Sequence, residues 1–123
     1  MYNRQSNIYR RVAVDSAPPT RILSELLDGL LADLSGAAEC IEARDVVGKA
    51  RRVNRALAII GALDAALDRA AAPELTANLA RLYDFAKERL LHASAHMETA
   101  PLLEAEQVLA PIRDAFAQAA RRA

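Results

Sequence analysis

The sequence lacks several features that would indicate particular classes of protein. Its 123 residues include one cysteine, Cys40, so no disulfide can form within the chain, which suits a reducing compartment. Sixteen basic residues balance sixteen acidic ones, whereas nucleic-acid-binding proteins usually carry a basic excess. No uncharged apolar run approaches the roughly 20 residues of a membrane span, and the amino terminus has no apolar stretch typical of a signal peptide. The sequence therefore predicts a soluble, intracellular protein without membrane insertion.

Aromatic residues and glycine are also scarce. The chain has no Trp, two Phe, three Tyr and four Gly, whereas 28 of its residues are alanine. Alanine and leucine favour helix, and there are few of the β-branched runs that favour strands. The length fits one domain with a buried core. These properties predict an all-α fold.

Apolar residues recur every three to four positions in four segments, which is the period of an amphipathic α-helix. The helices are expected over residues 19–43, 45–68 and 73–95, and from about residue 100 to near the carboxyl terminus. Asp45 and Thr99 are the predicted N-caps, and Pro73 and Pro101 fall in first turns, where proline is tolerated. Because the connections are short, neighbouring helices should be antiparallel. We therefore expect an antiparallel up-down-up-down four-helix bundle.

Two features depart from the helical pattern. Residues 1–17 are largely polar, with Val12 and Val14 alternating, which predicts a flexible, extended N-terminal arm before a bundle domain over residues 18–123. Pro111 lies inside the last expected helix and removes one backbone hydrogen bond there. Since the apolar spacing continues through Pro111, one bent helix is favoured over two short helices.

Side chains with catalytic or metal-binding chemistry are sparse. His92 and His96 lie four residues apart, with Glu88 one turn earlier, which is a spacing that aligns metal ligands on a helix. A di-iron bundle needs Glu-x-x-His on two helices, so a solvated face is the favoured interpretation. Cys40 is interpreted as a buried thiol. The acidic residues of the first helix are interpreted as solvent-facing, namely Glu25, Asp28 and Asp33. No catalytic residue, metal ligand or cofactor is predicted.

The second expected helix has two unusual faces. Arg51, Arg52 and Arg55 make it locally basic, and a solvated face is favoured because no aromatic platform for nucleic acid accompanies them. Ile59 and Leu63 are apolar but lie off the stripe of Val46, Val53, Leu57 and Ile60. They either widen the core or line an exposed groove that accepts a partner helix.

Five blocks of sequence are similar, in order along nearly the whole chain, to motifs of one protein family. They are residues 9–16 (YRRVAVDS), 26–29 (LLDG), 45–68 (beginning DVVGKA), 74–91 (beginning ELTANLARLYDF) and 112–116 (IRDAF). Together they resemble the flagellin-specific export chaperones, the FliS family. Leu27 stands where the family has an aromatic residue, and Phe116 stands where it has Trp, departures that bear on the choice of partner.

The resemblance implies a cytoplasmic four-helix bundle without enzymatic activity. Such a chaperone binds the disordered C-terminal segment of flagellin, prevents premature polymerisation and keeps flagellin competent for flagellar type III export. A direct contact with the flagellar export apparatus is left open. The alternative function is a helical-bundle adaptor with another client.

The resemblance also suggests which residues contact the client. Asn78, Leu82 and Tyr83 match conserved positions near the partner surface, although Leu82 suits the core equally well by its spacing. Leu75 and Leu79 are expected in the core. Further apolar area is expected from Ile59 and Leu63. We expect the arm to shield an apolar groove when no client is bound, through the residues Ile8, Tyr9, Val12 and Val14.

Overall fold

The computed structural model describes residues 19–122, and four α-helices account for most of them. The helices are α2 (Pro19–Glu42), α3 (Val46–Ala65), α4 (Pro73–His96) and α5 (Ala100–Arg122). The predicted all-α fold is confirmed, and the helix boundaries agree with the sequence pattern to within a few residues. The predictions for the arm, including Ile8, Tyr9, Val12 and Val14, lie outside the described residues.

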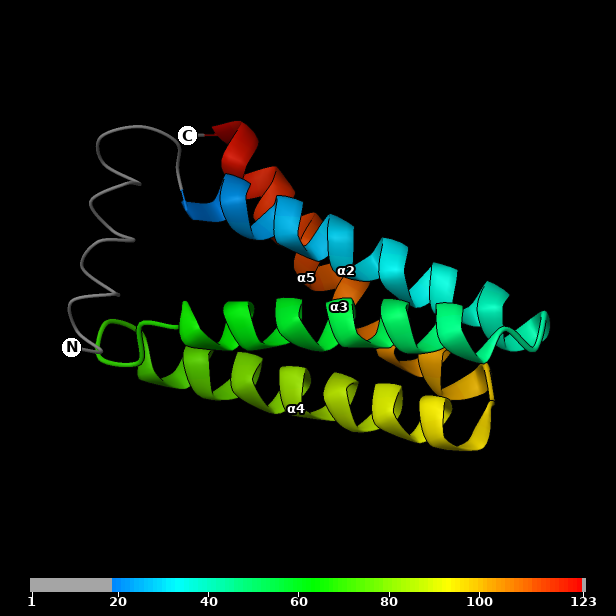
Figure 1. Ribbon diagram of the computed structural model, residues 1–123. Coiled ribbons are helices and arrows are strands. Elements are labelled where there is room, and N and C mark those ends of the chain that lie inside the picture. The colour runs from blue at the N-terminus through cyan, green and yellow to red at the C-terminus, as the bar shows by residue number, and fades with distance from the viewer. Residues whose placement is uncertain (1–18, 123) are drawn as a thin grey trace.

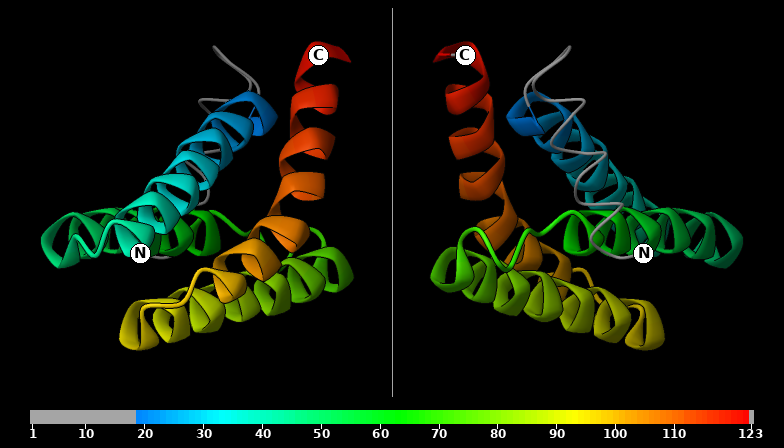
Figure 2. Two further views of the ribbon diagram at one scale, coloured as in Figure 1. Left: turned by 90° about the vertical axis from the view of Figure 1, so that its right-hand side faces the viewer. Right: turned by 90° about the vertical axis from the view of Figure 1, so that its left-hand side faces the viewer.

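Consecutive helices run in opposite directions, as expected for an up-and-down bundle (Figure 1). Helix α2 packs against α3 and α5, and α4 packs against α5 and, less extensively, α3. Helix α5 is continuous through Pro111 and changes direction midway along its length (Figure 2). The interpretation of one bent helix is therefore confirmed. Within residues 19–122, no helix is long and apolar enough to cross a membrane.

Two corners at the same end of the bundle join α2 to α3 and α4 to α5 (Figure 1). Arg44 and Met97 hold left-handed backbone conformations there, with φ of 59° and 53°. The next N–H after each, from Asp45 and Glu98, donates to a carbonyl oxygen five residues earlier, at 2.8 and 3.1 Å. This pattern terminates a helix and satisfies carbonyl groups that the last turn leaves free. Asp45 also accepts a hydrogen bond from the Gly48 N–H at 2.9 Å, which confirms the predicted N-cap of α3.

The core consists mainly of leucine, isoleucine and alanine side chains from all four helices. Leu79 is buried as expected, but Leu75 is 57% exposed and its assignment to the core was wrong. Leu75 lies in the first turn of α4, near the end of the bundle, where neighbouring helices leave it uncovered. Val46 is exposed for a similar reason, since it begins α3. Leu63 is fully buried, so this off-stripe residue widens the core and does not line a surface groove.

Asp33 corrects the expectation of a solvated acidic face on α2, because it is 1% exposed. Its Oδ1 accepts a hydrogen bond from Arg52 Nη1 at 3.0 Å, and its Oδ2 lies 3.8 Å from Arg55 Nε. Gly36 makes this approach possible, since a Cβ there would lie 2.6 Å from Arg52 Nε. Arg52 is therefore only partly solvated. Cys40, expected to be buried, is half-buried.

Candidate binding groove

An apolar groove lies between α4 and α5, at the end of the bundle where α2 begins. Its volume is about 450 Å³, and nine of its ten lining residues are apolar. The lining residues are Thr20, Leu75, Leu79, Leu82, Val108, Pro111, Ile112, Ala115, Phe116 and Ala119.

Helical periodicity gathers these side chains. On α4, Leu75, Leu79 and Leu82 recur at intervals of four and three, and the groove-lining residues of α5 follow the same period. Leu79 and Ile112 form the buried floor, whereas Leu82 and Phe116 are half-buried against the core. A continuous apolar surface of this kind favours the docking of an apolar partner.

Two polar residues are next to groove residues in the sequence. Asn78 precedes Leu79, is exposed, and accepts a hydrogen bond from Arg81 through its Oδ1. Arg113 follows Ile112 and bridges α5 to α2 through Asp28 at 3.0 Å. Hydrogen bonds to Asp114 and Asp28 raise the pKa of Arg113, so its positive charge is retained at any physiological pH. Both residues are next to groove residues in the sequence, and neither is among those that line the groove.

The structure separates the predicted contact residues into three groups. Leu82 lines the groove, and Asn78 is next to the groove residue Leu79 in the sequence. Tyr83 and Leu63 are buried in the core in this conformation. Ile59 is half-buried and packs with its Cδ1 towards Gly29 of α2, away from this groove.

Sequence reasoning missed the contribution of α5 to the groove. Val108, Ala115 and Phe116 recur at helical spacing with Pro111 among them. That spacing indicates an apolar helix face, which fits an ordinary core stripe as well as a groove. The signal that could have separated the two interpretations was Pro111, because a proline inside a helix disturbs packing against a straight neighbour.

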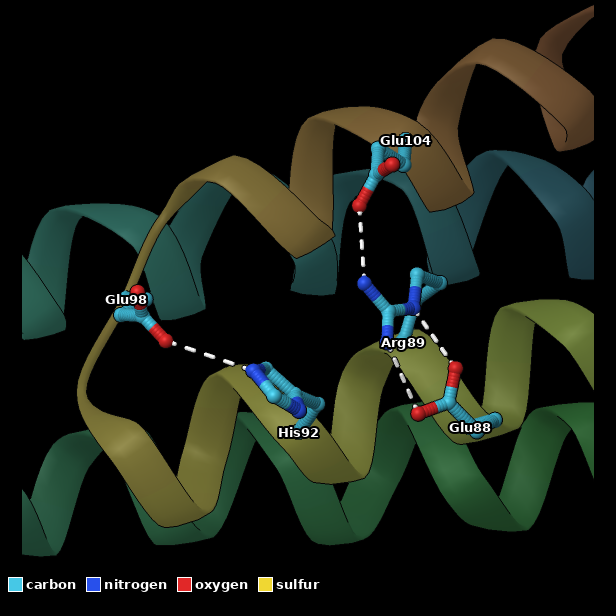
Figure 3. A network of polar contacts seen from close by, with 5 residues as sticks. All are labelled: Glu88, Arg89, His92, Glu98 and Glu104. Atoms are coloured by element: carbon cyan, nitrogen blue, oxygen red, sulfur yellow. Dashed lines mark hydrogen bonds and ion pairs between the residues drawn. The ribbon is translucent and has the colours of Figure 1, made fainter.

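A separate polar network joins α4 to the start of α5, at the far end of α4 (Figure 3). Arg89 bonds Glu88 at 2.6 and 2.8 Å and Glu104 of α5 at 3.0 Å. The hydrogen bond to Glu88 is the main cause that raises the pKa of Arg89, and the same bond lowers the pKa of Glu88. The network holds the two helices together with charged groups.

The histidines belong to the same region. His92 Nε2 lies 3.3 Å from Glu98 Oε1, and the ring centroids of His92 and His96 are 4.3 Å apart. Glu88, the third residue of the possible ligand set noted in the sequence, forms an ion pair with Arg89. Among residues 19–122, no three His, Cys, Asp or Glu side chains are placed to share a metal ion.

Comparisons with known proteins identify the family. A family model described as flagellar protein FliS matches residues 1–123. The flagellar secretion chaperone FliS of Salmonella typhimurium is 35% identical over 112 residues, which cover 90% of this chain and 83% of that protein. FliS of Bacillus subtilis is 32% identical over 111 residues, covering 90% and 82%, respectively. FliSB of Pseudomonas aeruginosa is 30% identical over 112 residues, covering 88% and 89%. The chain therefore belongs to the FliS family of flagellar secretion chaperones, which are not enzymes.

Proposed function

We propose that this protein is an export chaperone that binds the C-terminal segment of flagellin in the bacterial cytosol. Binding prevents premature polymerisation and keeps flagellin competent for type III export. The observation that carries this proposal is the apolar groove between α4 and α5 in a member of the FliS family. No chemical reaction is involved.

The groove meets the physical requirement for such a client. A disordered segment loses conformational entropy when it folds on a partner, so it must bury a large apolar area in return. A helix presents apolar side chains at intervals of three and four residues, and the groove offers rows with the same period on both walls. The client therefore binds as an amphipathic helix whose apolar face contacts Leu75, Leu82 and Phe116.

The N-terminal arm regulates access to this groove in our proposal. Thr20, the first groove residue along the chain, follows the arm almost directly. The arm carries the apolar residues Ile8, Tyr9, Val12 and Val14 among polar neighbours. These side chains have the chemistry to cover an apolar groove until a client displaces them.

The test mixes the purified full-length chain with a flagellin C-terminal peptide. We expect a one-to-one complex by size-exclusion chromatography and a gain of helix by circular dichroism. A scrambled peptide of the same composition is the control. If no complex forms at micromolar concentrations, the chaperone assignment is wrong, and the alternative of an adaptor with another client takes its place.

Two leucine variants locate the binding site. Leu75 lines the groove and is 57% exposed, whereas Leu103 of α5 is 56% exposed and lies outside it. Burying a leucine contributes about 1.5–3 kcal/mol, so Leu75→Ala should weaken peptide binding about tenfold or more. Leu103→Ala should bind the peptide like the unmodified chain. Equal losses in both variants would place the client elsewhere.

A further inference from the structure

Pro111 lies in the middle of α5 and is itself a groove residue. Proline has no N–H to donate to the carbonyl oxygen of Gln107, four residues earlier, and its ring crowds that carbonyl group. The turns before and after Pro111 are therefore pushed apart on the side of the helix that carries the ring. The helix axis bends away from that side.

The direction of this bend matters because the ring faces α4. Pro111 lines the groove together with Leu75, Leu79 and Leu82, which are all on α4. A bend that is convex towards α4 tilts the C-terminal half of α5 away from α4. Figure 2 shows this course: the orange half of α5 lies beside α4, and the red half turns away from it.

The exposure of the α4 side chains agrees with this explanation. Leu75 stands in the first turn of α4, on the side towards which a straight α5 would extend, and it is 57% exposed. Leu79, one turn further along α4, is buried, and Leu82 is half-buried. Of these three leucines, Leu75 is the most exposed, and it lies at the end of α4 that faces the diverging half of α5.

We infer that Pro111 keeps the groove open, because the bend that it imposes on α5 creates the space that a client helix occupies. This inference rests on the proposed function for its choice of client. A straight α5 would lie closer to α4 and cover the leucines that a client would contact. The bend thus removes contacts between α5 and α4 and leaves an apolar surface against which a client helix can pack.

Pro111→Ala is the decisive variant, because it changes stability and binding in opposite directions. Alanine restores the missing hydrogen-bond donor and has the highest helix propensity. We expect Tm to rise by about 5 °C or more. Affinity for the flagellin C-terminal peptide, measured by isothermal titration calorimetry, should fall about tenfold or more as the groove closes. A merely damaged fold would lower both quantities.

Pro73→Ala is the matched control. Pro73 is exposed, occupies the first turn of α4, and lies outside the groove lining. It should leave peptide affinity unchanged. If the unmodified chain and Pro111→Ala bind the peptide equally well, the inference about Pro111 is overturned while the proposed function stands. A fall in Tm would also overturn the inference, because the fold itself would then require the bend.

A second measurement separates this inference from the proposed function. A hydrophobic dye reports the open groove without any flagellin peptide. Pro111→Ala should bind less dye than the unmodified chain, and equal dye binding would overturn the inference. The unmodified chain could fail to bind the peptide while Pro111→Ala still binds less dye than the unmodified chain. That result would overturn the proposed function and leave the inference about Pro111 standing.

Discussion

Arg44 and Met97 show how single residues make the corners of this bundle. Both adopt left-handed backbone conformations, which let the chain leave α2 and α4 and turn back at once. A residue with a Cβ adopts this conformation at a penalty of about 1–2 kcal/mol, which glycine avoids. Met97 recovers part of the penalty by packing against the core, whereas Arg44 is exposed.

Arg44→Gly should therefore stabilise the protein. We expect the free energy of unfolding, measured by urea denaturation, to rise by about 0.5–1 kcal/mol, because glycine removes the strain and little packing is lost. Ala43→Gly, one residue earlier and without a positive φ, is the control and should be destabilising. If Arg44→Gly lowers the free energy of unfolding as much as Ala43→Gly does, the conformation of Arg44 carries little strain.

Single residues also show which properties a sequence can predict. Asp45 was recognisable as an N-cap because capping depends on residues only three positions away. The burial of Asp33 and Leu63 and the exposure of Leu75 depend on where other helices lie. Periodicity gives the apolar face of one helix, but it cannot show how far a neighbouring helix extends over that face.

At the scale of elements, an ion pair fixes α3 against α2. The Asp33 carboxylate is buried, and Arg52 reaches it across Gly36. Arg52 is 40% exposed, so the two partners have different access to water. Because a buried charge without a partner is destabilising, losing Arg52 and losing Asp33 should have unequal effects.

Arg52→Met should lower the free energy of unfolding by about 3 kcal/mol, since it leaves a buried carboxylate with only the more distant Arg55. Asp33→Asn should lower it by about 1 kcal/mol, because Arg52 can turn to solvent. Arg55→Met is the control, and its effect should be within about 0.5 kcal/mol, because the Arg55 side chain is 65% exposed and its Nε lies 3.8 Å from Asp33. Urea denaturation measures all three, and an Arg52→Met loss no larger than that of Asp33→Asn would contradict this explanation.

The bend in α5 was predictable at the element scale, but its consequence was not. Proline chemistry is local, so Pro111 indicated a bent helix from the sequence alone. The groove arises only when that bent helix is placed beside α4, with Leu75, Leu79 and Leu82 facing it. A binding surface between two elements is a property of their arrangement, which apolar spacing within each element does not specify.

At the scale of the whole molecule, the two ends of the bundle differ. One end holds both left-handed corners and lies nearer the contacts of Arg89 with Glu104 and of His92 with Glu98, so it is closed by hydrogen bonds and ion pairs (Figures 1 and 3). The other end holds the start of α2, the start of α4 and the last turns of α5, where the groove lies. The N-terminal arm, residues 1–17, leads in the sequence to the start of α2 at this second end, and for this reason we propose that it covers the groove.

Deleting residues 2–14 tests that role. If the arm covers the groove, the deletion should raise the binding of a hydrophobic dye, because the apolar lining becomes accessible to it. Client affinity should rise as well, because the client no longer competes with the arm for the groove. The expected factor is the inverse of the fraction of full-length molecules whose groove is open without a client. Deleting only residues 2–7 is the control, since it keeps Ile8, Tyr9, Val12 and Val14. If dye binding and client affinity are both unaltered in the longer deletion, the arm does not shield the groove.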